Sequence, residues 1–166
     1  MPNQLIAPSR VLRDYLSNSL VWEDFSAQGG FVDGDIVVAD PFKAGTTWTQ
    51  RIVQQILQNG EEGDGGLSDT SPWLDSSWGD HAAMLATLKG QREAGTRWVM
   101  KSHLPADALP IAPEARYVFV GRNGKDLDHR TELSPRQVER FDRVALNKLG
   151  AACAHWLETG ETSTAG

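Results

Sequence analysis

The chain has 166 residues and a mass of 18.2 kDa, enough for one domain with a buried core but not comfortably for two. Its residues are 40% hydrophobic and 23% charged, which excludes a disordered tail, a collagen-like fibre and a disulfide scaffold. The 16 Lys and Arg residues against 22 Asp and Glu residues give a net charge of −6. We therefore expect no general affinity for nucleic acid, and any anion must bind at a local site.

The sequence also bears on membranes and on the redox compartment. It has no run of about 18 apolar residues, so it predicts no membrane span. Residues 1–4 do not begin a secretory signal, and the single cysteine, Cys153, has no partner for an internal disulfide. These features predict a cytoplasmic protein.

In the first third of the chain the hydrophobic pattern changes its period. Loose apolar spacing from Val11 to Leu20 predicts a short helix, and a continuous, β-branched run predicts a buried strand over residues 35–39. Residues 48–57 then follow a helical period, and their apolar face is expected to lie in the core. That face comprises Trp48, Ile52, Val53, Ile56 and Leu57.

The rest of the chain continues this alternation. Apolar patterns predict a helix over residues 80–89 and strands over 97–103 and 115–120. A further helix is predicted to begin after Ser134, with a capping box in its first turn, and to end at Gly150. Strands that alternate with helices predict an α/β fold with a largely parallel sheet, whose ligands bind beyond the carboxyl ends of the strands.

The first chemistry-bearing segment, residues 41–48, reads Pro-Phe-Lys-Ala-Gly-Thr-Thr-Trp. A loop between a strand and a helix presents free backbone N–H groups at the positive end of the helix dipole. Gly45 lets the backbone approach an anion, Lys43 adds a charge, and Thr46 and Thr47 add hydroxyl donors. The segment predicts a phosphate cradle, although its order differs from that of the ATP and GTP P-loop. The alternative is a Gly-Thr helix cap with a solvated lysine.

The second segment, Lys-Ser-His, ends the strand predicted over residues 97–103. Because side chains alternate along a strand, Lys101 and His103 point to the same face. Such a pair can serve a transfer reaction, with the imidazole as general base and the amine as a stabiliser of negative charge. A solvated lysine beside a hydrogen-bonded structural histidine is the alternative.

The third segment follows the last predicted strand, in residues 117–126. A buried strand runs here into a basic turn that contains Arg122. Its guanidinium group could bind a phosphate in a bidentate manner. The alternative is a turn in which Arg122 pairs with Asp126.

Together, residues 41–48, 101–105 and 117–126 resemble motifs of the cytosolic sulfotransferase family. They resemble, in the family's order, its 5′-phosphosulfate loop, its catalytic strand end and the start of its 3′-phosphate segment. The resemblance covers about residues 30–127. It implies a P-loop-like, three-layer α/β/α fold with a central, largely parallel sheet, in a shortened form that makes residues 1–166 a single domain.

The resemblance also implies the chemistry. The donor would be 3′-phosphoadenosine 5′-phosphosulfate, no metal would be needed, and the acceptor would be a small hydroxyl or amine compound. His103 would take the acceptor's proton, and Lys43 and Lys101 would stabilise charge on the leaving phosphate and the migrating sulfuryl group. Trp48 would lie against the adenine or fill the core, and Arg122 would bind the 3′-phosphate. The 5′-phosphate end would be bound by Lys43, Ala44, Gly45, Thr46 and Thr47.

Members of the family are longer, and the difference falls near residues 127–128. The family continues there through a helical region and a loop that completes the 3′-phosphate and adenine site. In this sequence Arg130 stands where the family has a serine, and it either replaces the lost cation or is solvated. The shortening is expected to uncover part of the sheet, so we predict self-association, as in a homo-oligomer, or marginal stability.

The acceptor pocket is expected in the loops over residues 71–78 and 106–113. Trp73 and Trp78 suit an aromatic or hydrophobic alcohol, although such residues also fill cores. Two other functions stay open from the sequence. One is a catalytically defective nucleotide-binding module that retains only the phosphate cradle. The other is a P-loop kinase, which the absence of a Gly-Lys-Ser/Thr order disfavours.

Overall fold

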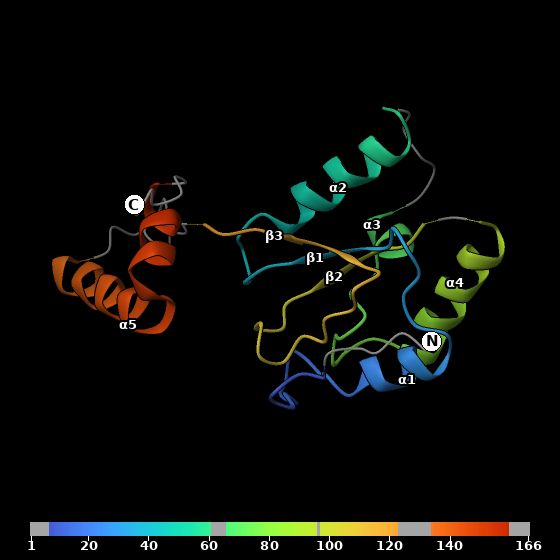
Figure 1. Ribbon diagram of the computed structural model, residues 1–166, viewed down its shortest axis with the longest axis horizontal. Helices are drawn as coiled ribbons and strands as arrows, with labels where there is room; N and C mark the ends of the chain where they lie inside the picture. Colours follow the sequence, from blue (N-terminus) through green and yellow to red (C-terminus); the bar gives the residue numbers. More distant parts are fainter. Residues whose placement is uncertain (1–6, 61–65, 96, 123–133, 160–166) are drawn as a thin grey trace. The chain divides into compact units, whose positions relative to one another are not determined.

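The computed structural model describes residues 7–60, 66–95, 97–122 and 134–159. The chain divides into two compact units, Met1–Val120 and Gly121–Gly166, and each is described by itself (Figure 1). The expectation of a single domain therefore stays a prediction. Within the described ranges, no helix is both long enough and apolar enough to cross a membrane.

The first unit is built around a three-stranded parallel sheet with the order β2-β1-β3. The strands are β1 (Ile36–Ala39), β2 (Val99–Ser102) and β3 (Arg116–Phe119), each shorter than its predicted range. Ala39, the last residue of β1, lies opposite Ser102, the last residue of β2. The prediction of a largely parallel sheet is confirmed, and its strands end side by side at one edge.

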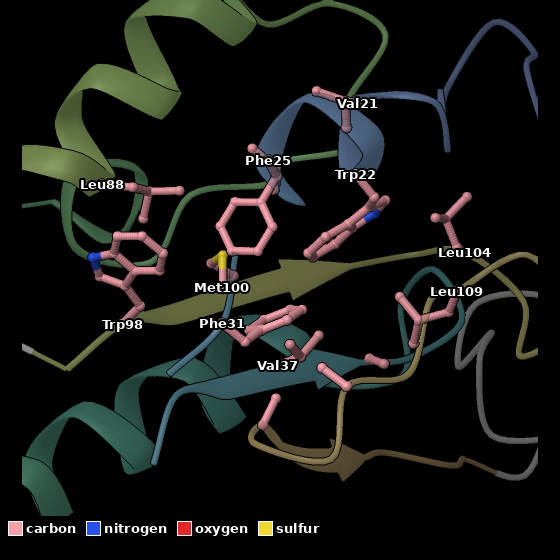
Figure 2. Packing of buried hydrophobic residues seen from close by; sticks show 14 of the residues in the cluster. Val21, Trp22, Phe25, Phe31, Val37, Leu88, Trp98, Met100, Leu104 and Leu109 are labelled. Atoms are coloured by element: carbon pink, nitrogen blue, oxygen red, sulfur yellow. The ribbon is translucent and has the colours of Figure 1, made fainter. Parts of the chain in front are cut away.

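Helices lie on both faces of this sheet. On one face are α1 (Val21–Ala27) and α4 (His81–Glu93), while α2 (Thr46–Leu57) lies on the other and is followed by the short α3 (Leu67–Thr70) (Figures 1 and 2). The predicted three-layer α/β/α fold is confirmed. The predicted helix over residues 80–89 is also confirmed, and Asp80 caps it by accepting a hydrogen bond from Ala83.

The hydrophobic core lies between the sheet and the layer of α1 and α4 (Figure 2). Its centre is aromatic: the Phe25 ring lies 4.8 Å from the Phe31 ring and 5.5 Å from the Trp98 ring, between centroids. Val37 and Met100, which have no exposed surface, close it from the sheet. Each such buried side chain contributes roughly 1.5–3 kcal/mol, so this face fixes the strands that carry the site.

The predicted short helix between Val11 and Leu20 is wrong, because this segment is irregular and the first helix starts at Val21. Polar side chains bind its backbone instead. The Asp14 carboxylate accepts hydrogen bonds from the backbone N–H groups of Leu16 and Ser17, and these bonds lower the pKa of Asp14. Such local side-chain bonds compete with helix formation, and they outweigh a loose apolar spacing.

The helix predicted over residues 48–57 is confirmed as α2, but the prediction of its buried face is wrong. Gln50 and Gln54 are buried, whereas Trp48, Ile52 and Ile56 are 78%, 50% and 70% exposed. The buried amides have partners: Gln50 donates to the carbonyl and hydroxyl oxygens of Ser71, and Gln54 donates to the Thr70 hydroxyl. An apolar stripe identifies the helix face that favours burial, but the residues that would cover this face need not belong to the described part of the chain.

The second unit contains α5 (Pro135–Thr159). Gly150, with a φ of 77°, interrupts the helix where the sequence predicts its end, and a further helical stretch follows. The Gln137 side chain accepts a hydrogen bond from the backbone N–H of Ser134, which is half of the predicted capping box. Local signals therefore place this helix correctly and miss only its continuation beyond Gly150.

Candidate active site

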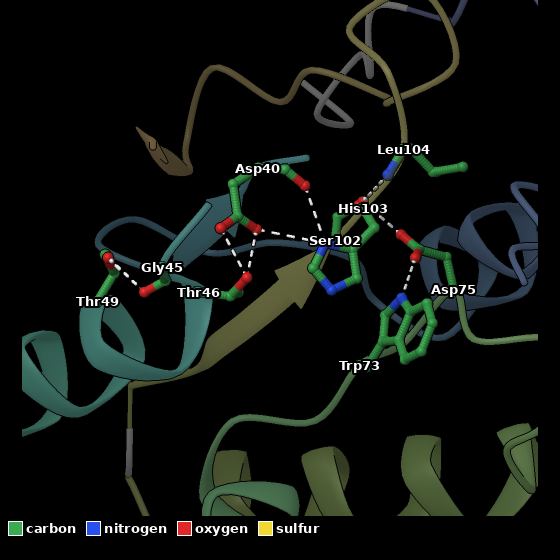
Figure 3. A network of polar contacts seen from close by, with 9 residues as sticks. All are labelled: Asp40, Gly45, Thr46, Thr49, Trp73, Asp75, Ser102, His103 and Leu104. Carbon is green, nitrogen blue, oxygen red and sulfur yellow. Dashed lines mark hydrogen bonds and ion pairs between the residues drawn. The ribbon is translucent and has the colours of Figure 1, made fainter. Parts of the chain in front are cut away.

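The carboxyl ends of β1 and β2 bring Asp40 and His103 together, although they lie far apart in the sequence. Each follows directly after its strand, and Ala39 and Ser102 are register partners. The Nδ1 atom of His103 lies 2.9 Å from the backbone carbonyl oxygen of Asp40 and 3.3 Å from its carboxylate Oδ1 (Figure 3). The parallel sheet thus fixes one side of the imidazole.

This contact determines where the imidazole carries its proton. A carbonyl oxygen only accepts hydrogen bonds, so Nδ1 of His103 is the donor, and in the neutral ring Nε2 has the free lone pair. Phe42 packs against the ring with centroids 4.2 Å apart, and the edge of Trp73 lies 5.0 Å away. With a side chain that is only 6% exposed, His103 is a fixed imidazole whose Nε2 has no partner among the described residues.

The Asp40 carboxylate links this histidine to the start of α2. Its side chain is fully buried, and its oxygens lie 2.8 and 2.6 Å from the Thr46 hydroxyl, which donates to it (Figure 3). Burial of a carboxylate is costly unless donors surround it, so this bond stabilises the junction of strand and helix. The Thr46 hydroxyl is therefore engaged with Asp40, which leaves the backbone N–H as the donor that Thr46 could offer to an anion.

The loop that leads from β1 into α2 contains two residues with positive φ. Lys43 has a φ of 66° and Gly45 a φ of 124°, a region that favours glycine, so Lys43 stores strain of roughly 1–3 kcal/mol. Gly45 caps α2 without a side chain, and the backbone N–H groups of Thr46, Thr47 and Trp48 find no acceptor in the described parts of the chain. With the exposed Lys43, they form an electropositive turn.

Lys101 lies on the same side of β2 as His103, as the alternation predicts, and both contact Trp73. The Lys101 Nζ lies 5.0 Å from the centre of the Trp73 ring. Partial burial lowers the pKa of Lys101, while the negative charges of Asp40 and Asp75 oppose that change. The Lys101 amine is therefore partly shielded from water, so its positive charge interacts more strongly with nearby negative charges than it would in solvent.

Beside Trp73 and Lys101 lies a cavity of about 560 Å³. Trp73, Trp78 and Met84 line it with apolar surface, and Thr47 brings the start of α2 to its wall. Its volume is in the range of pockets for drug-sized molecules. The expectation that residues 71–78 help to form a pocket is consistent with this lining.

Other predicted site residues are placed differently. Trp48 is 78% exposed, so the alternative that it fills the core is wrong. Arg122 belongs to the second unit, whose placement relative to the first is not described. Arg130 and the rest of residues 123–133 lie outside the described residues.

Sequence reasoning missed the buried acids of this site, Asp40 and Asp75. Asp40 offered a signal, because a polar residue directly after a buried strand stands at the ligand-binding edge of a parallel sheet. Asp75 offered none, since an acid in an irregular segment reads as solvated until its neighbours are known.

Comparison with known proteins decides the family. A model of the sulfotransferase domain matches residues 33–128, more than half of the chain. The chain belongs to the sulfotransferase family. The match contains the loop of residues 41–48 together with Lys101, His103 and Arg122, so the resemblance seen in the sequence is confirmed.

Relatives within the sulfotransferase family come from bacteria and mammals. A glycolipid sulfotransferase of Mycobacterium tuberculosis (strain ATCC 25177 / H37Ra) is 35% identical over 116 residues, which cover 70% of this chain and 33% of the relative. Sulfotransferase 1E1 of Bos taurus is 28% identical over 111 residues, 63% of this chain and 35% of the relative. Sulfotransferase 1B1 of Mus musculus is 31% identical over 100 residues, which cover 57% of this chain and 33% of the relative. The chain thus spans about a third of the length of these curated relatives.

Proposed function

We propose that the chain transfers a sulfuryl group from 3′-phosphoadenosine 5′-phosphosulfate to a hydroxyl or amine of a small acceptor, with His103 as general base. The observation that carries this proposal is the hydrogen bond from His103 Nδ1 to the Asp40 carbonyl oxygen at 2.9 Å. It leaves Nε2 with the lone pair that can receive the acceptor's proton. Family membership supplies the reaction class.

The residues of the loop fit the 5′-phosphate end of this donor. The N–H groups at the start of α2, which have no acceptor among the residues that the structure describes, and the ammonium group of Lys43 are the partners that phosphate oxygens require. Ala44 and Gly45 provide the close backbone approach, and the exposed indole of Trp48 offers a flat face for adenine. Arg122 is proposed for the 3′-phosphate. When bound, the donor supplies the sulfuryl group and a phosphate leaving group, with adenosine 3′,5′-bisphosphate as product.

The side chains around His103 have separate tasks in this proposal. Nε2 of His103 removes the proton as the acceptor oxygen or nitrogen bonds to sulfur. Lys43 and Lys101 place positive charge where negative charge grows on peripheral oxygens. By analogy with phosphoryl transfer, positioning and electrostatics supply most of the rate in such an in-line displacement. These steps use no metal ion.

The acceptor proposed for the cavity is an aromatic or hydrophobic alcohol. The apolar walls given by Trp73, Trp78 and Met84 favour a ring or alkyl group over a strongly charged molecule. The name of the mycobacterial relative is consistent with an acceptor that combines hydroxyl groups with apolar parts. A nucleic acid or a membrane surface is not among the proposed partners, and a cytoplasmic location stays a prediction.

We also propose that the chain self-associates through the apolar face of α2. Ile52 and Ile56 lie on neighbouring turns of this helix, and each is at least half exposed. Exposed apolar surface of this kind marks contact sites in soluble proteins.

A transfer assay tests the function directly. With donor labelled in its sulfuryl group and 4-nitrophenol as acceptor, we expect label in the phenol. His103→Gln should reduce the rate by roughly 10²–10⁴-fold. His155→Gln, an exposed histidine of α5, is the matched control and should leave the rate unchanged. Equal rates in both variants, or binding of nucleotide without any transfer by the wild-type chain, would contradict the proposal.

A further inference from the structure

We propose that Asp75 is a positioning residue that holds the Trp73 ring against Lys101 and His103. This inference rests on the proposed function, because it assigns to Asp75 the task of fixing the groups that act there. Asp75 lies in the irregular segment between α3 and α4 and has no exposed surface.

The Asp75 carboxylate collects hydrogen bonds from separate parts of the first unit (Figure 3). The Trp73 indole N–H donates to one oxygen at 2.6 Å. The Ser102 hydroxyl and the Trp22 indole N–H donate to the other at 2.5 and 3.1 Å. Burial raises the pKa of Asp75, and these bonds, together with one from the backbone of His103, oppose that rise. The bonds thus join α1, the segment of Asp75 and the end of β2.

Trp73 connects the hydrogen bonds around Asp75 to the proposed reacting groups, Lys101 and His103. Its backbone pairs in parallel with that of Lys101, and its ring lies under the Lys101 ammonium group at 5.0 Å. The same ring contacts His103 at 5.0 Å and Phe42 at 5.8 Å, and it lines the proposed acceptor cavity. The hydrogen bond that the indole N–H donates to Asp75 fixes the rotation of this ring.

Ser102 gives Asp75 a second connection to the same pair. Because strand side chains alternate, Ser102 points away from the face that carries Lys101 and His103. Its hydroxyl donates to Asp75 and accepts from the backbone N–H of Leu104, so it restrains the chain on both sides of His103. Asp75 therefore fixes both the backbone of the pair and the ring that contacts each of them.

An ionised carboxylate is suited to this task because it only accepts hydrogen bonds. Asp75→Asn presents one oxygen and an NH₂ group in place of two acceptor oxygens, so either the Trp73 indole or the pair of Trp22 and Ser102 loses its acceptor, and the network that holds the Trp73 ring is broken. The substitution also removes a negative charge that favours protonated Lys101. Asp35 is a matched control: it is equally buried, but it binds Arg92, Val32 and Trp98 before the start of β1.

The experiment compares wild type, Asp75→Asn and Asp35→Asn. Calorimetric titration with adenosine 3′,5′-bisphosphate gives the number of folded binding sites, and kcat for 4-nitrophenol is divided by that number. We expect Asp75→Asn to lower kcat per site by roughly 10–100-fold, since displacement of about 1 Å has effects of this size. Asp35→Asn should lower the number of folded sites but leave kcat per site unchanged. If Asp75→Asn does not fold, Trp73→Phe, which deletes the indole N–H and keeps a ring, replaces it with the same expectation.

A second readout needs no turnover. The ring-proton NMR shifts of His103 depend on the neighbouring indole, so they should move in Asp75→Asn or Trp73→Phe and stay in place in Asp35→Asn. If the wild-type chain binds nucleotide but transfers nothing, the proposed function is refuted. The NMR shifts then still test whether Asp75 positions the Trp73 ring beside His103. Unmoved His103 shifts, or a kcat per site within twofold of wild type, would overturn the inference.

Discussion

The bond between Thr46 and Asp40 gives a test of how the loop and the histidine are joined. Thr46→Val keeps the shape of the side chain and removes the hydroxyl that lies 2.8 and 2.6 Å from the carboxylate oxygens. Thr46 is 7% exposed and Asp40 is 2% exposed, so water cannot replace the lost donor without a rearrangement. Among the residues that the structure describes, the carboxylate would keep the more distant His103, at 3.3 Å, as its one partner.

The expected cost follows from the type of bond. A hydrogen bond to a charged group contributes about 1.5–3 kcal/mol, and a buried carboxylate left short of a donor brings the cost toward the upper part of that range. We therefore expect Thr46→Val to lower the free energy of unfolding by about 2.5–3 kcal/mol. Thr49→Val is the control on the same helix, because its hydroxyl bonds a neutral carbonyl, that of Gly45, at 3.2 Å. It should cost less than about 1 kcal/mol.

Urea unfolding followed by tryptophan fluorescence measures this difference, since Trp22 and Trp98 lie in the core of the first unit. The midpoint should fall in Thr46→Val while the slope with denaturant stays constant. A Thr46→Val variant within about 0.5 kcal/mol of wild type, or a Thr49→Val variant equally destabilised, would refute the claim that this bond stabilises the junction.

Other residues give further predictions. Burial lowers the pKa of Lys101 below 10.5, so the folded chain releases this proton at a lower pH than the unfolded chain does. The free energy of unfolding should therefore rise with pH between the lowered pKa and 10.5. Urea unfolding across that range should show this rise in the wild type and not in Lys101→Met. Trp48→Ala should change the free energy of unfolding by less than about 0.5 kcal/mol but weaken binding of adenosine 3′,5′-bisphosphate, and a large loss of stability would show that the indole packs in the core. Ile52→Ser with Ile56→Ser should shift the mass seen by light scattering toward the monomer; a wild-type monomer would contradict self-association.

Where the sequence predicted the structure, local chemistry decided the outcome. The β-branched run over residues 35–39 forms β1 because such residues suit a strand buried on both faces, and Val37 and Val38 have no exposed surface. The helix that begins at Pro135 follows from Ser134 and Gln137, whose side chains act within a single turn. Signals of this kind need no knowledge of distant residues.

The failures depend on partners that lie far apart in the sequence. The apolar stripe of α2 predicted a buried face, but the buried face is the one where Gln50 meets Ser71. The pairing of Lys101 and His103 was predictable from alternation, whereas the support that Asp75 gives them joins residues 22, 73, 75 and 102. A buried acid becomes visible only when donors from several segments are seen to converge on it.

In the proposed reaction, the turn before α2 binds the phosphate end of the nucleotide donor. Calorimetric titration of the whole chain with adenosine 3′,5′-bisphosphate tests it most directly, with Lys43→Ala as the variant and Lys89→Ala, on the exposed surface of α4, as the control. We predict saturable binding by the wild type, clearly weaker binding by Lys43→Ala and no change in Lys89→Ala. Absence of heat on titration of the folded wild type, or equal affinity in the two variants, would contradict the account.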